Sequence, residues 1–448
     1  MKGYIGKVKN IDKKALYILI GVLAGLLPMI SGMGWLYIFL FAVGSIITML
    51  LIYRYDLVWI INIFLLSFVL FEPAPCDILF ILLFIFGILG GHMDFYRFKG
   101  CGVMIVSIVI FAVINTLQLF YIPELEVGIK YFLITLYLIL FCLFVFMYVS
   151  GGNLKGLLKA YVLSASLSAI LGIAAYAGLF PSVLMYDAYR IKAFFKDPNV
   201  LGPFLVPSVL ILMEDMNKGH IIGHSKWAYR LLIVINLLGI AATFSRGAWG
   251  NLIFSVIIYL ILNRKNIDFK KLNYKSICIH LAVIAIALCL IWYFGAGAGF
   301  RAFVYGRMNI QSYDTGRFLV QRAGVRLAFV NPFGYGPGQF EYTVINQTGV
   351  EFSPHNLYIR VLMENGIVGF VVFIGFLVAI FYKLILDLKS KSAYGIITPS
   401  LLIAILSGIM LNSTVIDTLH WRHLWFFLGL GMANFLLGGG GRYEDTRN

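Results

Sequence analysis

Three side chains could together carry out chemistry on a phosphate group: Arg246, Arg317 and His355. A guanidinium group presents a fixed fork of N–H donors that matches the oxygens of a phosphate. An imidazole, with an unperturbed pKa of about 6.5, is the natural base for a hydroxyl nucleophile. Together these residue types predict transfer of a group from a phosphate-bearing donor to a hydroxyl, provided that the fold brings them together.

Arg246 lies in Thr243-Phe244-Ser245-Arg246-Gly247, between two apolar runs that have no real loop between them. One interpretation is an arginine whose side chain extends to lipid headgroups at the membrane boundary. The other is a tight turn that directs a guanidinium group and unpaired backbone N–H groups at one point, which would bind an anion. The sequence leaves both interpretations open.

Arg317 follows Thr315-Gly316 and opens a helix-like run from Phe318 to Val330. Arg322 and Arg326 in this run are four residues apart and share a helix face, whereas Arg317 lies about 140° and 180° from them. A regular helix therefore directs Arg317 elsewhere. Arg322 and Arg326 are candidate substrate-binding residues, and the alternative is an amphipathic helix whose cations lie among headgroups.

His355 is the only histidine between positions 281 and 419, and it ends a long polar segment in Ser353-Pro354-His355-Asn356. A single histidine is most often structural. Next to cations, however, its pKa should fall, so that the ring stays neutral and accepts a proton. We expect His355 to act as the base, with Asn356 and Tyr358 as nearby substrate-binding candidates.

Arg190 and Asn199 flank a second basic stretch, which includes Lys192 and Lys196. Pro198 suits the first turn of a helix, with Asp197 as its N-cap. This stretch is either a capped helix start with interfacial cations or a cationic rim that helps to bind the substrate.

The elements that position these residues are membrane helices. The 448-residue chain is 61% hydrophobic and 12% charged, a composition that excludes an ordinary soluble protein. Its formal charge of +15 follows the positive-inside rule and gives no reason to expect nucleic acid as a partner. The five cysteines form no close pair, so neither a metal site nor a disulfide framework is predicted. We expect a single all-α membrane domain over residues 1–448.

Fourteen apolar runs predict about fourteen crossings, with both termini in the cytoplasm. Most lysines and arginines then fall on the cytoplasmic side, with the basic run from Arg264 to Lys275 as its strongest marker. His420-Trp421-Arg422-His423, at the last outer turn, is typical of interfacial anchoring. The predicted runs are 15–31, 35–53, 57–71, 78–91, 101–120, 128–149, 157–178, 198–213, 231–244, 247–262, 276–296, 366–385, 394–411 and 424–438.

The segment 297–354 is the one long polar stretch, and it is predicted to be an extracytoplasmic loop. A loop of this length in a compact protein is usually functional. Basic residues gather here against the positive-inside trend, which predicts an anionic ligand on the outer face. Its few carboxylates (Asp314, Glu341 and Glu351) are widely spaced, which argues against a metal-dependent or two-carboxylate mechanism.

From about Arg190 to Gly369 the chain resembles the superfamily of bacterial O-antigen ligases and Wzy-type O-antigen polymerases. The tryptophan expected a few residues after Arg317 is absent, and Val320-Gln321 stand in that region. The likeness is carried by five motifs in order: Phe195-x-Asp197-Pro198-Asn199-x-x-Gly202, Ser245-Arg246-Gly247, Gly316-Arg317, Asn331-Pro332-Phe333-Gly334-Tyr335-Gly336-Pro337-Gly338-Gln339-Phe340, and His355-Asn356-x-Tyr358 with Glu364-x-Gly366.

The resemblance implies a GT-C-like membrane glycosyltransferase whose core covers residues 190–369. Such enzymes invert the anomeric centre, need no metal or other cofactor, and act in the bacterial cytoplasmic (inner) membrane on its periplasmic or exterior face. Their donor is an undecaprenyl-pyrophosphate-linked glycan, and their other partners are an acceptor glycan, membrane lipids and a chain-length regulator protein. The essential arginines would correspond to Arg246 and Arg317, and the essential histidine to His355.

Three functions are compatible with these observations. A polymerase would join lipid-linked repeat units, and the large number of predicted crossings favours it slightly. A ligase would move the finished glycan to lipid A-core or another acceptor. A glycan or lipid transporter should carry buried charges at mid-membrane, and few are predicted here.

Overall fold

The computed structural model describes residues 34–93, 95–149, 153–216, 219–264, 297–309, 312–350, 352–389 and 397–438. Within these ranges the regular structure is helical, as predicted, and one isolated β-bridge joins Met185 to Ile191. The helices before the long loop are α2 (Gly34–Tyr53), α3 (Tyr55–Phe64), α4 (Pro75–Leu89), α5 (Gly102–Gln118), α6 (Leu125–Tyr148), α7 (Leu154–Tyr176), α8 (Pro198–Asp215), α9 (Lys226–Ala242) and α10 (Arg246–Leu262). The later helices are α12 (Ala298–Met308), α13 (Ser312–Val330), α14 (Phe340–Thr348), α15 (Leu357–Lys389), α16 (Pro399–Asn412) and α17 (Arg422–Gly438).

Twelve of the fourteen predicted runs coincide with helices, and the runs 15–31 and 276–296 lie outside the described residues. Three described helices are long and apolar enough to cross a membrane: Leu125–Tyr148, Leu154–Tyr176 and Leu357–Leu388. In the region of the runs predicted at 35–53 and 57–71, Val43–Tyr53 and Tyr55–Ser67 form a pair bent by 117°, the geometry of a broken span or a re-entrant loop. Fourteen crossings and the cytoplasmic termini therefore stay predictions.

The connections that the sequence assigned to the outer side contact one another. Lys196 Nζ lies 2.9 Å from Glu72 Oε1, which joins two of these loops. The Gln339 side chain accepts a hydrogen bond from the Glu124 backbone N–H and donates one to its carbonyl oxygen. At the opposite end Thr398 Oγ1 donates to Glu214 Oε2, between connections assigned to the inner side. The grouping of the loops thus matches the alternation predicted from sequence.

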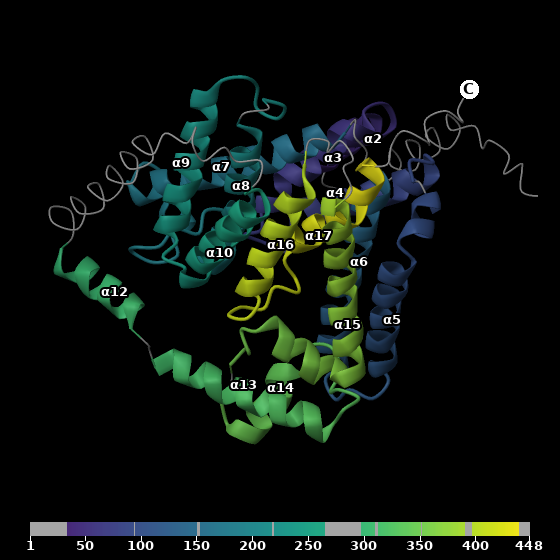
Figure 1. Ribbon diagram of the computed structural model, residues 1–448, viewed down its shortest axis with the longest axis vertical. Coiled ribbons are helices and arrows are strands. Elements are labelled where there is room, and N and C mark those ends of the chain that lie inside the picture. Colours follow the sequence, from purple (N-terminus) through teal and green to yellow (C-terminus); the bar gives the residue numbers. More distant parts are fainter. Residues whose placement is uncertain are drawn as a thin grey trace, which may run out of the picture.

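The long loop is itself helical. Figure 1 shows α12, α13 and α14 along one end of the helix bundle, with α13 and α14 beside the adjacent end of α15. Helices α13 and α14 have a small apolar core of their own, separate from the main core of the bundle, because their apolar faces pack on one another and on the start of α15. Its buried members are Val320, Leu327, Ala328, Phe340, Val344 and Met363.

The glycine-rich turn after α13 packs against a break in α15. Gly366 has φ 69° and ψ −176°, a conformation that is essentially restricted to glycine, and it interrupts the helix. Gly334 has φ +85° and lies directly against the backbone of Asn365 and Gly366. Ile367 N–H donates to the Pro332 carbonyl at 2.9 Å, and Gly336 N–H donates to the Glu364 carbonyl at 2.8 Å. The break therefore supplies backbone groups that fix the turn.

The interfacial anchoring predicted for residues 420–423 is not what the structure shows. Arg422 makes two hydrogen bonds to the carboxylate of Asp77, at 2.7 and 2.6 Å, in the interior of the bundle. His423 is only 2% exposed. Arg422 therefore connects α17 to α4 and does not act as an interfacial anchor.

Candidate active site

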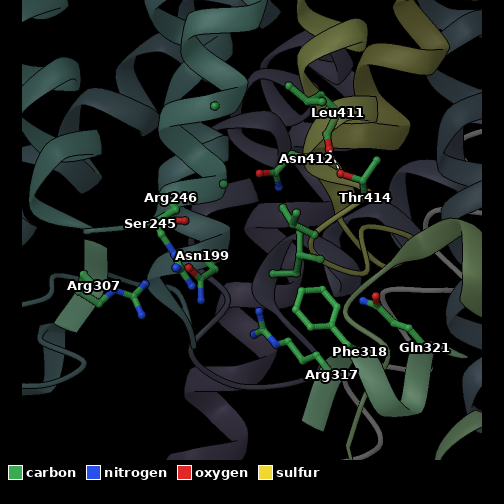
Figure 2. Close-up of a pocket in the computed structure, with 14 residues that line it drawn as sticks. Asn199, Ser245, Arg246, Arg307, Arg317, Phe318, Gln321, Leu411, Asn412 and Thr414 are labelled. Carbon is green, nitrogen blue, oxygen red and sulfur yellow. Dashed lines mark hydrogen bonds between the residues drawn. The ribbon is translucent and has the colours of Figure 1, made fainter. Parts of the chain in front are cut away.

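A cavity of about 410 Å³ opens between the start of α10, the end of α16 and the helices of the long loop. The cavity gathers residues that are far apart in the sequence. Figure 2 shows two groups of them: one side holds Arg246, Ser245, Asn199 and Arg307, and the other holds Leu411, Asn412 and Thr414. The lining residues are Asn199, Ser245, Arg246, Gly247, Gly250, Arg307, Arg317, Phe318, Gln321, Leu411, Asn412, Thr414, Val415 and Ile416.

Arg246 is placed by the tight turn between α9 and α10. Phe244 has φ 48°, a left-handed conformation that is costly for a bulky residue. Ser245 caps α10, because its hydroxyl accepts a hydrogen bond from Ala248 N–H. The first turn of α10, with Arg246 and Gly247, therefore forms one wall of the cavity and directs the N-terminal end of the helix at it. Anion binding by this turn stays a prediction.

Arg307 is the functional candidate that the motifs did not single out. It lies near the end of α12, lines the cavity and donates from Nη2 to the Phe244 carbonyl at 2.9 Å. Phe300 and Phe303 hold α12 against the bundle through ring contacts with Phe244. The only signal in the sequence was the excess of arginines in the segment 297–354, which does not distinguish one arginine from another.

Arg317 lines the same cavity, whereas Arg322 and Arg326 are exposed and do not. All three lie on α13, and the angular offset expected from their spacing accounts for the separation. The helix begins at Ser312, before the predicted start. The cavity thus combines guanidinium groups from α10, α12 and α13.

His355 lies at the cavity wall but does not line the cavity itself. Its neighbours in sequence are fastened to lining residues: Gln321 Nε2 donates to the Pro354 carbonyl at 2.7 Å, and Asn356 Nδ2 donates to the Thr414 carbonyl at 2.9 Å. Its φ of 43° is an uncommon left-handed value, held by these bonds. Gln321 is thus one of the residues that position this loop.

The environment of His355 lowers its pKa to about 4. Burial is the main cause, because it disfavours the charged ring, and the Arg317 guanidinium is the second. The lowered pKa of His355 agrees with the expectation from sequence. A neutral imidazole next to an arginine is ready to accept a proton.

The predicted neighbours of His355 have supporting contacts. Asn356 Oδ1 accepts from Ile359 N–H and so caps α15, while Tyr358 Oη donates to the Met410 carbonyl at 2.8 Å. Both tie the start of α15 to the end of α16. Neither lines the cavity.

Arg190 is buried beneath the site rather than within the cavity. Its Nε donates to the Thr243 carbonyl at 2.9 Å, and its Nη2 donates to Asn199 Oδ1 at 3.1 Å. Burial and the nearby Arg307 lower the pKa of this guanidinium. Arg190 therefore orients Asn199, which lines the cavity, and fixes the turn before Arg246.

Arg360 organises a buried ionic cluster behind His355. It pairs with Glu364 at 2.8 Å and Asp417 at 2.5 Å, and it also pairs with Glu341. Its Nη2 donates to Ser353 Oγ at 3.0 Å, two residues before His355. The cluster joins α14, α15 and the loop before α17 to the loop that carries His355. Glu364 is four residues from Arg360 on the same helix, whereas Glu341 and Asp417 are distant along the chain, so sequence spacing did not predict the whole cluster.

Residues 231–374 match the O-antigen ligase family. This segment covers about a third of the chain. The family resemblance expected from the motifs is therefore confirmed, and the domain contains Arg246, Arg307, Arg317 and His355. Asn199 and the residues of α16 lie outside the matched segment, so the cavity is completed by parts of the chain that flank it. A comparison with curated proteins finds no match to this chain.

Proposed function

We propose that the protein is a membrane glycosyltransferase that polymerises undecaprenyl-pyrophosphate-linked oligosaccharide units on the outer face of the bacterial cytoplasmic membrane. The observation that carries the proposal is the convergence of Arg246, Arg307 and Arg317 on one cavity next to His355. Three guanidinium groups suit a diphosphate, whose charge increases as it leaves the sugar. The O-antigen ligase domain supports this reaction type.

The cavity also suits a donor with a lipid tail. Leu411, Val415 and Phe318 also line it and are between 39% and 55% exposed. An apolar surface that is continuous with a cationic one matches a polyprenyl chain attached to a diphosphate. A soluble sugar nucleotide would leave this apolar part unused.

The reaction follows from these placements. The hydroxyl oxygen of the acceptor sugar attacks the anomeric carbon of the donor, and the bond from that carbon to the diphosphate oxygen breaks. The bonding electron pair leaves with the diphosphate, where Arg246, Arg307 and Arg317 stabilise it. His355 accepts the proton of the attacking hydroxyl. Attack from the face opposite the leaving group inverts the anomeric centre.

The experiment is extension of lipid-linked oligosaccharide by the purified protein. We expect His355→Ala and Arg317→Ala to abolish extension, and Arg307→Ala to slow it by about 10²–10³-fold, the usual cost of losing one donor to a developing charge. Arg301→Ala is the matched control, since Arg301 is exposed on the same helix as Arg307 and does not line the cavity. Activity of the Arg307 variant equal to that of the Arg301 variant would remove Arg307 from the mechanism.

The same assay separates the alternative functions. Transfer of glycan only to added lipid A-core would identify a ligase, which uses the same chemistry with another acceptor. Movement of lipid-linked glycan across vesicles without a new glycosidic bond would identify a transporter and overturn the proposal.

A further inference from the structure

Asn412 is a buried polar residue that lines the cavity, and its side chain has no hydrogen-bond partner among the described residues. It is the last residue of α16 and is 2% exposed. Neither its Nδ2 nor its Oδ1 has a hydrogen-bond partner. Figure 2 places it across the cavity from Ser245 and Arg246. A buried amide with both ends unsatisfied is costly, and it indicates a group that is supplied by a ligand.

Other buried asparagines near the site use their amides for packing contacts. Asn365 Nδ2 donates to Asn115 Oδ1 and to Gln118 Oε1, at 2.9 and 3.1 Å. Asn251, one helix away from Asn412, accepts from Ser255 at 3.1 Å through its Oδ1. Asn412 differs from them because both of its amide atoms remain available at the edge of an open cavity.

Gly247 explains how Asn412 comes so close to the first turn of α10. A Cβ on Gly247 would lie 2.7 Å from Asn412 Oδ1, which is closer than such atoms approach. The glycine of the Ser245-Arg246-Gly247 motif therefore leaves room for the amide of α16. Asn412 is thus held beside the residue that is proposed to bind the diphosphate.

The chemistry of an amide selects its ligand. Asn412 offers two N–H donors and one carbonyl acceptor and carries no charge. A diphosphate oxygen can only accept, and it would leave Oδ1 unsatisfied. A sugar hydroxyl both donates and accepts, so it can satisfy both ends of the amide. We propose that Asn412 binds a hydroxyl group of the sugar that is attached directly to the donor diphosphate, an inference that rests on the proposed function.

The test compares two ligands of the purified full-length protein: undecaprenyl diphosphate, and undecaprenyl diphosphate carrying one N-acetylglucosamine. We expect Asn412→Leu to weaken binding of the sugar-bearing lipid by about 10-fold, the effect of roughly one lost hydrogen bond. Its affinity for undecaprenyl diphosphate should not change. Isothermal titration calorimetry measures both constants.

A purely structural role for Asn412 predicts different results. Asn412→Leu removes an unsatisfied amide and should keep or raise the thermal unfolding midpoint. Asn236→Leu is the control: this buried asparagine on α9 donates to Ser166 Oγ at 2.8 Å, and its loss should lower the midpoint and leave the ratio of the two affinities unchanged. A lower midpoint for Asn412→Leu with an unchanged affinity ratio would overturn the inference.

A third variant separates this inference from the proposed function. Arg317→Ala should weaken binding of both lipids, since both carry the diphosphate. If the wild-type protein binds neither lipid, the proposed function fails and the inference fails with it. If the wild type binds both lipids and Asn412→Leu weakens both equally, only the inference fails.

Discussion

At the scale of single residues, the site separates charge from proton transfer. Three arginines line the cavity, while His355 does not line it and stays neutral because it is buried next to Arg317. A free-protein pKa of about 4 makes His355 a weak base. A bound diphosphate would bring negative charge to the same place and raise this pKa toward neutrality, where base catalysis is efficient. The bound donor would thereby make His355 a stronger base.

The titration of His355 tests this coupling. Arg317 lowers the pKa of His355, so Arg317→Gln should raise it from about 4 toward the ordinary value of about 6.5. Addition of undecaprenyl diphosphate to the wild-type protein should shift it in the same direction. NMR of protein labelled with ¹⁵N-histidine measures the pKa, and His355→Gln assigns the signal among the seven histidines. No shift on either change would show that the ring and the cations are not coupled.

At the scale of elements, the long loop is a helical cap that is fixed at two places. Its turn, residues 331–338, is locked onto the break in α15, and its last residues are fastened to α13 and to the loop after α16. Arg360 links α14 to the same region through Glu341. The positions of Arg317 and His355 therefore depend on backbone geometry far from both side chains.

The break at Gly366 gives the prediction for this scale. Gly366→Ala would place an alanine in a left-handed conformation, and its Cβ would collide with the backbone of Pro332 and Phe333. We expect a loss of about 1–3 kcal/mol of stability from the backbone conformation alone, and a further loss from the displaced turn. Thermal unfolding of the purified protein measures the effect, and donor extension should fall as the cap is displaced.

Gly375→Ala is the matched control for this variant. Gly375 lies in the regular part of α15, and a Cβ there would meet no atom within 4 Å. It should be neutral, or stabilising by up to about 1 kcal/mol through helix propensity. Equal behaviour of the two variants would mean that the break at Gly366 does not hold the cap.

At the scale of the whole molecule, the orientation of the protein in the membrane decides whether the cavity faces lipid-linked glycan. The arginines of the cavity lie among loops that the positive-inside rule assigns to the outer face, which is the reverse of the usual distribution. The two groups of loops lie at opposite ends of the bundle, so the location of one loop fixes the location of the others.

Cysteine labelling tests the orientation. Gln347 on α14 and Lys155 at the start of α7 are both exposed and belong to opposite ends. In a cysteine-free background, Gln347→Cys should react with a membrane-impermeant maleimide in intact spheroplasts, whereas Lys155→Cys should react only after permeabilisation. The opposite pattern would place the cavity in the cytoplasm and contradict the proposed outer-face activity.

The sequence by itself determined the class of the protein, most helix positions and the residue types of the site. Apolar runs and caps are local properties, so α8 begins at Pro198 with Asp197 as its N-cap, as expected. The separation of Arg317 from Arg322 and Arg326 also followed from helix periodicity alone. Motif order was sufficient to indicate the resemblance that residues 231–374 confirm. Arg190 was a candidate for substrate binding, and it lies beneath the site instead of lining the cavity.

Only the tertiary structure decided which of these residues share a cavity. Arg307 and Asn412 belong to it because α12 and α16 pack near α10, and no local pattern distinguishes them from similar residues elsewhere. Glu341 and Asp417 reach Arg360 for the same reason, because both are far from it in the chain. Propensity and periodicity act over a few residues, whereas a site is formed by contacts between distant segments, which depend on the packing of the whole bundle.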